Sequence, residues 1–435
     1  MVLLCLIGVV AWVWLVFCLA FLTRLRLVGK IVVAVVAGIA VGISFTGFAA
    51  AMGLIPIDPT ANRWWWMFAN SLLVVLFYLC LALGLVAVVA LVVRVLAGPL
   101  PTKNAIDNIS TVQSQDAPTQ AGPTPNADMM EGEGWVEEDT GDSPPRTAIP
   151  RRTRVVRVLC VLSIVVAMCV TAYGYVAALR PQITHYTVAN SQLPSSFEGF
   201  TIALVTDIHL GATVDGQFVS RLVDQINAER PDLIVIAGDL VDGTPDQLGP
   251  EIAVLSRLSA PYGVIVTTGN HEFYWGAKEW MAAFADLGLT TLDNEGIQIV
   301  ADGDSIDILG IEDSSGTGNM APDVTLASSR MAETFDTPPS GTGRYRILIA
   351  HRPSEAARQD GAAARLGVDL QLSGHTHGGQ VWPLQLFTEL AQGTVGGEAE
   401  LSGITVVTSR GVASWGPPVR VGSTPEVPII TLTQG

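Results

Sequence analysis

Four long apolar runs constrain this chain more than any other feature. They cover residues 1–22, 31–57, 64–93 and 158–179, and each reaches the about 20 apolar residues that cross a hydrocarbon layer of about 30 Å. A backbone surrounded by lipid has no water to satisfy its polar groups, so these runs predict helices. Only 15% of the residues are charged, against about 25% in a soluble domain. The sequence therefore predicts a multi-pass membrane protein.

The basic residues predict how the runs are oriented. Arg24, Arg26 and Lys30 follow the first run, four arginines at 151–157 precede the fourth, and the loop between the second and third runs carries only Arg63. Cytoplasmic loops carry the excess of Lys and Arg, so we expect the loops after the first and third runs to face the cytoplasm. The first run lacks the positive start of a signal peptide, so we expect it to stay uncleaved. Four crossings then place the C-terminal domain on the extracytoplasmic side of the cell membrane.

Composition divides the chain into five parts. We expect three transmembrane helices in 1–97, a disordered cytoplasmic loop at 98–154, a fourth transmembrane helix at 155–180, a juxtamembrane linker at 181–195 and a soluble domain at 196–435. The loop is rich in Pro, Thr, Asp and Glu and has no helical period. Such a composition buries too little apolar surface to fold.

The soluble part is acidic. Residues 196–435 hold 12 Lys and Arg against 30 Asp and Glu, a net charge of −18. Nucleic-acid binding needs a basic footprint, so this charge excludes nucleic acid as a partner. The five cysteines of the chain all lie in the apolar runs, so no disulfide framework holds this domain together.

Short apolar runs of strand length recur through residues 196–435. They are rich in Val, Ile and Leu, and turn residues bound most of them, which predicts strands. Two amphipathic stretches, 217–228 and 278–287, have helical spacing and lie between some of the strands. This alternation indicates an α/β domain. The predicted strands are 201–206, 233–237, 263–267, 306–309, 346–350, 370–372, 404–407 and 427–432.

Histidines and aspartates follow these predicted strands. Five of the six histidines of the chain lie in such loops, within Asp207-Ile208-His209, Gly238-Asp239, Gly269-Asn270-His271-Glu272, His351 and Gly374-His375-Thr376-His377. Functional loops lie at the carboxyl ends of buried strands, and imidazole with carboxylate suits Mn, Fe, Zn, Co or Ni. Seven candidate ligands are too many for one tetrahedral ion. They fit two adjacent ions that share a carboxylate.

This ordered set of motifs resembles the calcineurin-like metallophosphoesterase superfamily over about residues 196–435. The variants GNHEFYWG, LSGHTHGGQVW and SRGVASWGPPVR are similar to its membrane-associated bacterial phosphohydrolase branch. The resemblance implies a four-layer α-β-β-α sandwich with a dinuclear metal centre at one edge. The four-helix transmembrane region that precedes it is a departure from that branch, whose membrane portion is commonly shorter, and carries over no assignment from the family. The resemblance further implies that one ion is bound by Asp207, His209 and His377, that the other is bound by Asn270, His351 and His375, and that Asp239 bridges both.

The resemblance also implies a role for His271, which matches the family's histidine that binds no metal. It would stabilise the phosphoryl transition state or protonate the leaving oxygen. Two divalent transition-metal ions lower the pKa of a bridging water, and the resulting hydroxide attacks phosphorus in line. The sequence thus predicts a membrane-anchored phosphoesterase for phosphomono- or diesters. Membrane attachment favours lipid-linked or envelope substrates.

Two other classes of function share these features. A catalytically silent sensor or scaffold would have lost ligands, whereas all seven positions and His271 hold suitable residues. A transporter would carry ionisable residues inside its helices, and the four runs have almost none.

Several other residues near these motifs each suit two roles. Asp242 and Glu272 could each orient a site residue or cap a helix. Tyr274 and its aromatic neighbours could line a pocket or pack in the core. Arg352 and Arg410 could contact phosphate or form structural salt bridges.

Overall fold

Three long apolar helices precede the sheets in the computed structural model, which describes residues 11–18, 26–51, 63–96, 151–335, 344–358 and 361–435. They are α2 (Leu27–Ala51), α3 (Arg63–Leu96) and α5 (Arg151–Ala178), and each contains a segment long and apolar enough to cross a membrane. These helices correspond to the second, third and fourth predicted runs. Most of the first run lies outside the described residues, although 11–18 are helical. The number of four crossings therefore stays a prediction, as does the disordered loop, of which 97–150 lie outside the described residues.

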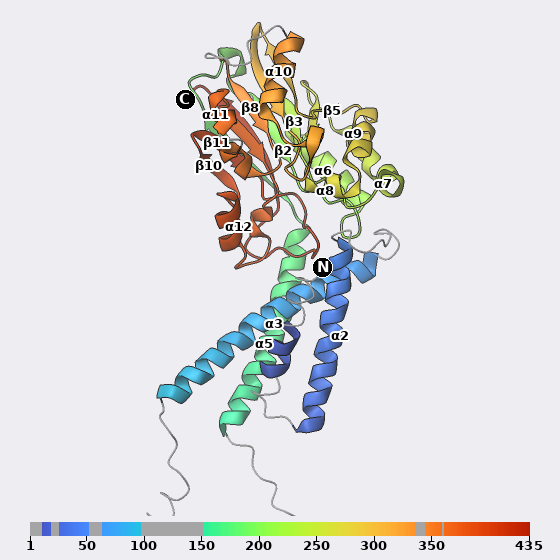
Figure 1. The fold of residues 1–435 in the computed structure, drawn as a ribbon, viewed down its shortest axis with the longest axis vertical. Helices are drawn as coiled ribbons and strands as arrows, with labels where there is room; N and C mark the ends of the chain where they lie inside the picture. The colour runs from blue at the N-terminus through green and yellow to red at the C-terminus, as the bar shows by residue number, and fades with distance from the viewer. Residues whose placement is uncertain (1–10, 19–25, 52–62, 97–150, 336–343, 359–360) are drawn as a thin grey trace, which may run out of the picture.

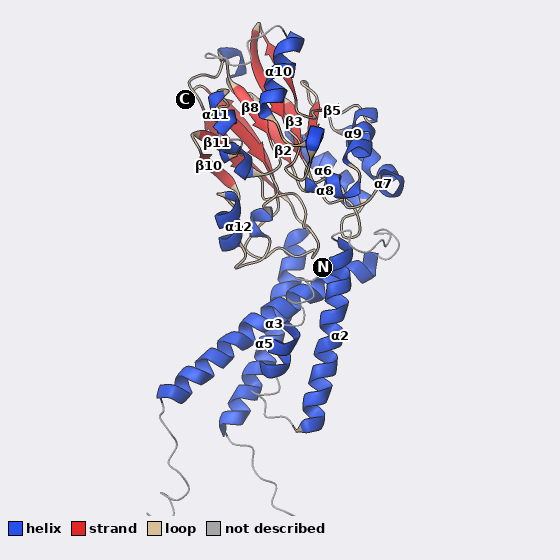
Figure 2. Cartoon of the chain, viewed as in Figure 1, coloured by secondary structure: helices blue, strands red, loops and turns tan. Residues whose placement is uncertain are grey.

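The rest of the described chain forms two mixed sheets that pack face to face, with helices outside them (Figures 1 and 2). The first sheet has the strand order β1-β12-β2-β3-β4-β5, and the second has the order β10-β11-β9-β8-β7-β6. Their strands are β1 (Gln182–Ala189), β2 (Thr201–Val205), β3 (Leu233–Ala237), β4 (Val264–Thr267), β5 (Thr290–Thr291), β6 (Glu295–Ala301), β7 (Asp304–Gly310), β8 (Arg346–Ile349), β9 (Leu370–Ser373), β10 (Gly397–Leu401), β11 (Ile404–Thr408) and β12 (Glu426–Thr433).

Successive side chains along a strand point to opposite faces of its sheet, and this alternation produces the layers. In β2, Ile202 and Leu204 point into the core between the sheets, whereas Ala203 and Val205 pack against the outer helices. This period of two gives an inner strand such as β2 two buried faces. The helices outside the first sheet include α6 (Gly216–Glu229), α7 (Pro245–Ile252), α8 (Asn270–Trp275) and α9 (Ala277–Asp286), and those outside the second include α10 (Val324–Phe335) and α11 (Ala362–Arg365). The four-layer α-β-β-α sandwich is confirmed.

The segment 181–195 differs from its prediction as a linker. Residues 182–189 form β1, which pairs in parallel with β12 over its whole length, with Gln182 opposite Glu426 and Ala189 opposite Thr433. This strand lies at the edge of its sheet, and most of its side chains are exposed or half-buried. Its sequence, QITHYTVA, therefore lacks the apolar run by which the buried strands were predicted. Helix α5 also begins at Arg151, four residues before the predicted start of the fourth span.

Several contacts fix the sheets on the helices. Arg63 at the start of α3 pairs with Glu251 of α7 at 2.7 Å. The backbone N–H of Arg420 donates to the carbonyl oxygen of Gly174 in α5 at 2.9 Å. A Cβ on Gly174 would lie 2.5 Å from Val419, so only glycine permits this approach. The two parts of the molecule therefore meet through ion-pair, hydrogen-bond and packing contacts.

Candidate metal centre

The predicted ligands follow the carboxyl ends of five strands, at the edge of the sandwich where the two sheets meet. Parallel strands end at a common edge, which brings side chains far apart in sequence together. Asp207 and His209 follow β2, Asp239 follows β3, Asn270 follows β4, His351 follows β8, and His375 and His377 follow β9.

The backbone at these positions is strained. Five of the seven predicted ligands have positive φ angles: Asp207 (57°), His209 (50°), Asp239 (56°), His375 (68°) and His377 (49°). A left-handed conformation costs a non-glycine residue about 1–2 kcal/mol. Strain of this kind persists where the surrounding structure enforces it, and it clusters at functional sites.

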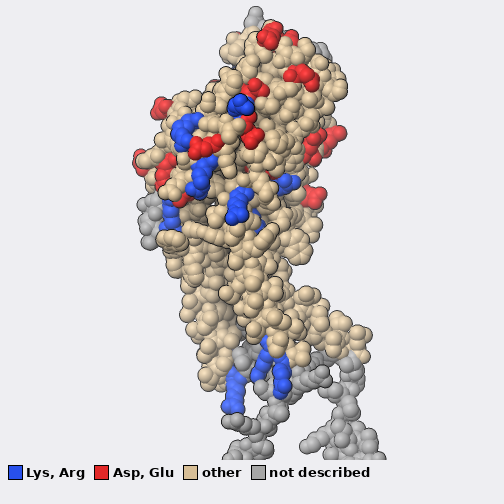
Figure 3. Space-filling view, turned by 180° about the vertical axis from the view of Figure 1, so that it is seen from behind, with Lys and Arg blue, Asp and Glu red and all other residues tan. Residues whose placement is uncertain are grey.

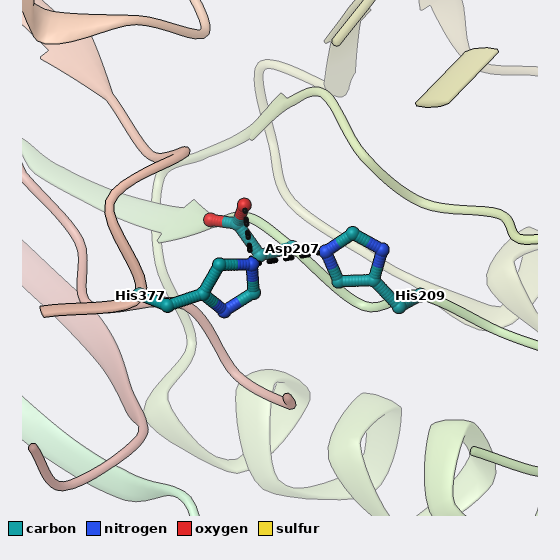
Figure 4. A group of neighbouring side chains, drawn as sticks. All are labelled: Asp207, His209 and His377. Atoms are coloured by element: carbon teal, nitrogen blue, oxygen red, sulfur yellow. Dashed lines mark hydrogen bonds and ion pairs between the residues drawn. The ribbon is translucent and has the colours of Figure 1, made fainter. Parts of the chain in front are cut away.

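Asp207, His209 and His377 form one group of possible metal ligands (Figure 4). The Nε2 atoms of His209 and His377 lie 3.0 Å apart, and Nε2 of His377 lies 3.4 Å from an oxygen of Asp207. Ligand atoms about 2.0–2.2 Å from one ion lie about 3.0–3.5 Å from each other. Asp207 and His209 are fully buried. The donor set therefore fits a divalent ion at this position.

Asp239, His351 and His375 form a second group. Nε2 of His351 lies 3.1 Å from an Asp239 oxygen and 3.2 Å from Nδ1 of His375. Nδ1 of His351 lies 2.8 Å from the carbonyl oxygen of Ala237, to which it can donate its proton. That tautomer leaves the Nε2 lone pair free to bind a metal. The Asp239 oxygen also lies 3.8 Å from Nε2 of His209, so Asp239 stands between the two groups.

Asn270 supplies an unsatisfied oxygen beside the second group. Its side chain is 5% exposed, and among the described residues its Oδ1 atom has no hydrogen-bond partner. A buried amide oxygen without a partner costs about 1–3 kcal/mol. Asn270 and Asp239 line the same cavity. An ion bound there would satisfy this oxygen.

Comparison with known proteins gives the family. A sequence model described as calcineurin-like phosphoesterase matches residues 200–379. An uncharacterized metallophosphoesterase of Campylobacter jejuni is 31% identical over 284 residues, which are 64% of this chain and 71% of that protein. The chain belongs to the calcineurin-like metallophosphoesterases. This membership makes it a phosphoester hydrolase with residues suited to bind divalent metal.

Two further relatives extend the comparison. An uncharacterized metallophosphoesterase of Bacillus subtilis is 31% identical over 60% of this chain and 89% of its own length. A bovine protein named "Transmembrane protein with metallophosphoesterase domain" is 32% identical over 63% of both chains. The chain thus spans less than two thirds of the bovine relative. A crystal structure of a dimetal phosphatase from Danio rerio is similar over 49% of this chain and 88% of its own, with 14% identity and a TM-score of 0.31.

The charges of the metallophosphoesterase site favour the metal-binding state of some ligands and the protonated state of others, and burial raises the pKa of Asp207. Burial would raise the pKa of Asp239, but His351 and His271 hold it well below its usual value. Burial and the neighbouring His351 lower the pKa of His375 to about 3. Burial would lower the pKa of His351, but Asp239 raises it to about 10. Metals bind carboxylate and neutral imidazole, so metal binding would release a proton from His351.

Asp242 connects His271 to the first ligand group. Its Oδ1 atom lies 2.5 Å from Nδ1 of His271 and 3.2 Å from Nδ1 of His209. The N-terminal cap of the following helix is Thr244 instead. Burial would lower the pKa of His271, but Asp239 and Asp242 raise it to about 9. Asp242 therefore orients His209 and His271 and does not cap the helix.

Glu272 holds two ligand loops together. Its carboxylate accepts hydrogen bonds from the backbone N–H groups of Asp239, Leu240 and Gly269 at 2.9, 2.7 and 2.7 Å. A Cβ on Gly269 would lie 2.2 Å from Oδ1 of Asp239, so only glycine lets the loops approach this closely. Glu272 therefore caps α8 and positions Asp239 in one arrangement.

Arg420 is a positioning residue to which the sequence assigned no role. Its guanidinium is buried, and it donates to the carbonyl oxygens of His377 and Ala413. Nδ1 of His377 lies 3.3 Å from the same Ala413 oxygen. The segment SRGVASWGPPVR, which ends in Arg420, was the available signal, through its likeness to the family.

Two arginines and two aromatic residues also had two possible roles, and the structure places some of them at the cavity and others in structural contacts. Arg352 lines the cavity beside the ligands and pairs with Asp313 at 2.7 Å. Arg410 pairs with Glu426 at 3.1 Å. Tyr274 lines the cavity, with its ring 5.0 Å from that of His271, whereas Trp275 packs against the core.

Proposed function

We propose that this protein is a membrane-anchored phosphoesterase with a dinuclear centre that hydrolyses phosphomono- or diesters. The observation that carries the proposal is that two donor groups of metal-binding type meet at Asp239. One ion would be held by Asp207, His209 and His377, and the other by Asn270, His351 and His375, with Asp239 shared. Bound divalent ions would lower the pKa of a water and supply hydroxide near neutral pH.

The protein's own part in the reaction falls to His271. It lines the cavity beside Asp239, and its Nε2 atom lies 4.0 Å from an Asp239 oxygen. Asp242 accepts a hydrogen bond from Nδ1–H of His271, so the Nε2–H group is the one available to a substrate. A protonated imidazole there can stabilise charge on a phosphoryl oxygen or pass its proton to the leaving oxygen.

We further propose that the sheets lie on the extracytoplasmic side. Arg63, at the start of α3, contacts the sheet domain, so Leu96, at the other end of α3, lies away from it. Figure 3 shows Lys and Arg side chains gathered at the end of the helices farthest from the sheets. The positive-inside rule places that end in the cytoplasm. Protease added to sealed spheroplasts should digest the sheet domain and spare residues 98–154; protection of the sheet domain would reverse this orientation.

Activity and metal content of the full-length protein in detergent test the function. The full chain is required because β1 lies before residue 196. Chelator-treated protein should lose hydrolysis of 4-nitrophenyl phosphate and bis(4-nitrophenyl) phosphate. Addition of Mn, Zn, Fe, Co or Ni should restore it, with two ions per chain by elemental analysis. Full activity without metal would reject the proposal, and so would a single bound ion at saturation.

A further inference from the structure

The candidate metal centre opens into a cavity that reaches a transmembrane helix. The cavity has a volume of 720 Å³ and is lined by residues from the ligand loops, from α3 and from α12 (Gln385–Gln392). Its polar end carries Asp239, Asn270, His271, His375 and Arg352. Arg352, a cation, and the imidazole of His271 thus line the part of the cavity where a phosphate would bind.

The other end of the cavity is apolar. Leu73, Val74 and Phe77 of α3 form one wall, and Leu384 and Phe387 form another. Leu73, Val74 and Phe77 lie inside the segment 63–93, which is apolar and long enough to span a membrane. At a rise of about 1.5 Å per residue, Phe77 lies roughly 20 Å along the helix from Arg63. Part of the wall therefore belongs to the apolar segment of α3 that is long enough to cross a membrane.

Contacts between α3 and the loop before α12 keep this wall in place. The hydroxyl of Tyr78 donates to the carbonyl oxygen of Trp382 at 2.8 Å. Val381 and Val419 pack in one cluster with residues of the apolar helices. The side chain of Gln380 ties this loop to the next through the carbonyl oxygens of Trp415 and Pro417, at 2.9 and 3.0 Å.

Helix α12 and the loop before it carry large exposed apolar side chains, among them Phe387 of the cavity wall, which is 67% exposed. Trp382, Leu386 and Leu390 are 60%, 68% and 87% exposed, and Leu386 and Leu390 lie four residues apart on one face of the helix. Figure 1 shows α12 at the end of the sheet domain that faces the helices. An apolar helical face at this level matches a helix lying in the membrane interface.

We propose that the substrate is an amphiphile, a phosphoester joined to a hydrocarbon chain, and that it enters from the bilayer between α3 and α12. This inference rests on the proposed function. The phosphate would lie beside His271 and Arg352, and the chain would lie against Leu73 and Phe387. Each CH₂ group that leaves water contributes about 0.8 kcal/mol, roughly fourfold in affinity.

The test compares substrates that differ only in chain length. Full-length protein in detergent is assayed with butyl and dodecyl phosphate and with the butyl and dodecyl esters of 4-nitrophenyl phosphate. If the protein cleaves monoesters, the two alkyl phosphates are compared; if it cleaves diesters, the two alkyl 4-nitrophenyl phosphates are compared. We expect kcat/KM to be at least tenfold higher for the dodecyl compound. Equal kcat/KM values for the butyl and dodecyl compounds would overturn the inference. If the same protein cleaves 4-nitrophenyl esters and holds two ions, the proposed function would stay intact.

A pair of variants separates the cavity from simple partitioning of the substrate into micelles. Leu73→Trp fills the apolar end, and Leu81→Trp places the same side chain elsewhere on α3, at a residue that is 41% exposed. We expect Leu73→Trp to lower the dodecyl-to-butyl ratio at least fivefold and Leu81→Trp to leave the ratio unchanged. An unchanged ratio in Leu73→Trp would overturn the entry route. Metal-loaded protein that cleaves no ester would reject the proposed function itself, and the inference with it.

Discussion

Strand β8 has a buried charged cluster at each end, and the two clusters differ in kind. At its amino end, Arg346 is fully buried and its Nε atom lies 3.0 Å from Asp307. Asp307 also pairs with Arg344 at 3.2 Å, and the backbone N–H of Arg346 donates to Asp369 at 2.9 Å. Donors and acceptors match, so this cluster holds the strand ends together and offers nothing to a ligand.

At the carboxyl end of β8 the balance is different. His351, Asp239 and His375 are brought together with imidazole nitrogens facing each other at 3.2 Å. Asn270 leaves an oxygen without a partner among the described residues, and Asp239 has a φ of 56°. Burial and charge are common to both ends. Unused bonding capacity and backbone strain occur at the ligand end, and they distinguish a site from a structural salt bridge.

The largest expected effect comes from removing the carboxylate of Asp239 at the ligand end of β8. Asp239→Asn removes the carboxylate that both ligand groups approach. We therefore expect both positions to lose their metal and kcat/KM to fall at least 10³-fold, which corresponds to about 4 kcal/mol. Elemental analysis and ester hydrolysis measure the two losses. Retention of two ions per chain would reject the shared role of Asp239.

Asp307→Asn is the matched change at the amino end. Breaking a buried pair costs about 3–5 kcal/mol of stability, so the melting temperature should fall. The folded fraction should keep two ions per chain and its kcat. Loss of metal from folded Asp307→Asn protein would show that the two ends are not separate in function.

His271 tests the chemistry without removing a ligand. His271→Gln should lower kcat by about 10²–10⁴, the usual range for general acid–base catalysis, while metal content stays at the wild-type value. A phenolic leaving group needs little protonation, so nitrophenyl esters should lose less than alkyl esters if His271 is the acid. Equal losses would assign it to charge stabilisation. An unchanged kcat would remove it from the mechanism.

The sequence predicted the buried strands and missed the edge strands. All eight predicted strands exist, and they are the inner strands of both sheets, whereas β1, β5, β6 and β10 occupy the four edges. A strand buried on both faces reads as a continuous apolar run, such as LIVIA in β3. An edge strand such as GEAEL in β10 alternates glutamates with small or apolar residues, so it lacks the continuous apolar run by which the inner strands were predicted.

The site residues likewise divide into those that the sequence predicts and those that it does not. The predicted ligands were recognisable because chemistry restricts their residue types and their positions after strands. Asp242 was ambiguous, because an acid three residues after a ligand also suits a helix cap. Arg420 depends on long-range packing against His377, 43 residues away in sequence, and no local pattern records such a contact.

Glu272 tests how firmly the ligand end depends on its supports. In Glu272→Gln, an amide N–H would face backbone N–H groups that now donate to the carboxylate. Loss of an orienting partner of this kind lowers metal affinity about 10–100-fold. Metal titration of the chelator-treated protein measures the change, and Glu279→Gln on α9 serves as an exposed control. Wild-type affinity in Glu272→Gln would mean that Asp239 holds its position without this carboxylate.

The smallest expected effect is a pH dependence at the ligand end. Glu312 is 3% exposed and accepts a hydrogen bond from Thr268 at 2.6 Å. Burial raises its pKa from 4.5 to about 7, although the bond from Thr268 lowers it. A carboxyl with a raised pKa contributes stability that is fully present below pH 4.5 and lost as the pH rises through about 7.

Glu312→Gln keeps an acceptor for Thr268 and removes the charge. Its melting temperature should therefore match that of the wild type near pH 4.5 and exceed it by a few degrees at pH 8.5, because only the wild type must then bury an ionised carboxyl. Glu333→Gln on α10, at an exposed position, removes the same charge and should show no such divergence. If the difference between Glu312→Gln and the wild type does not grow with pH, the buried carboxyl is neutralised in another way. The ligand end would then resemble the paired cluster at the amino end of β8.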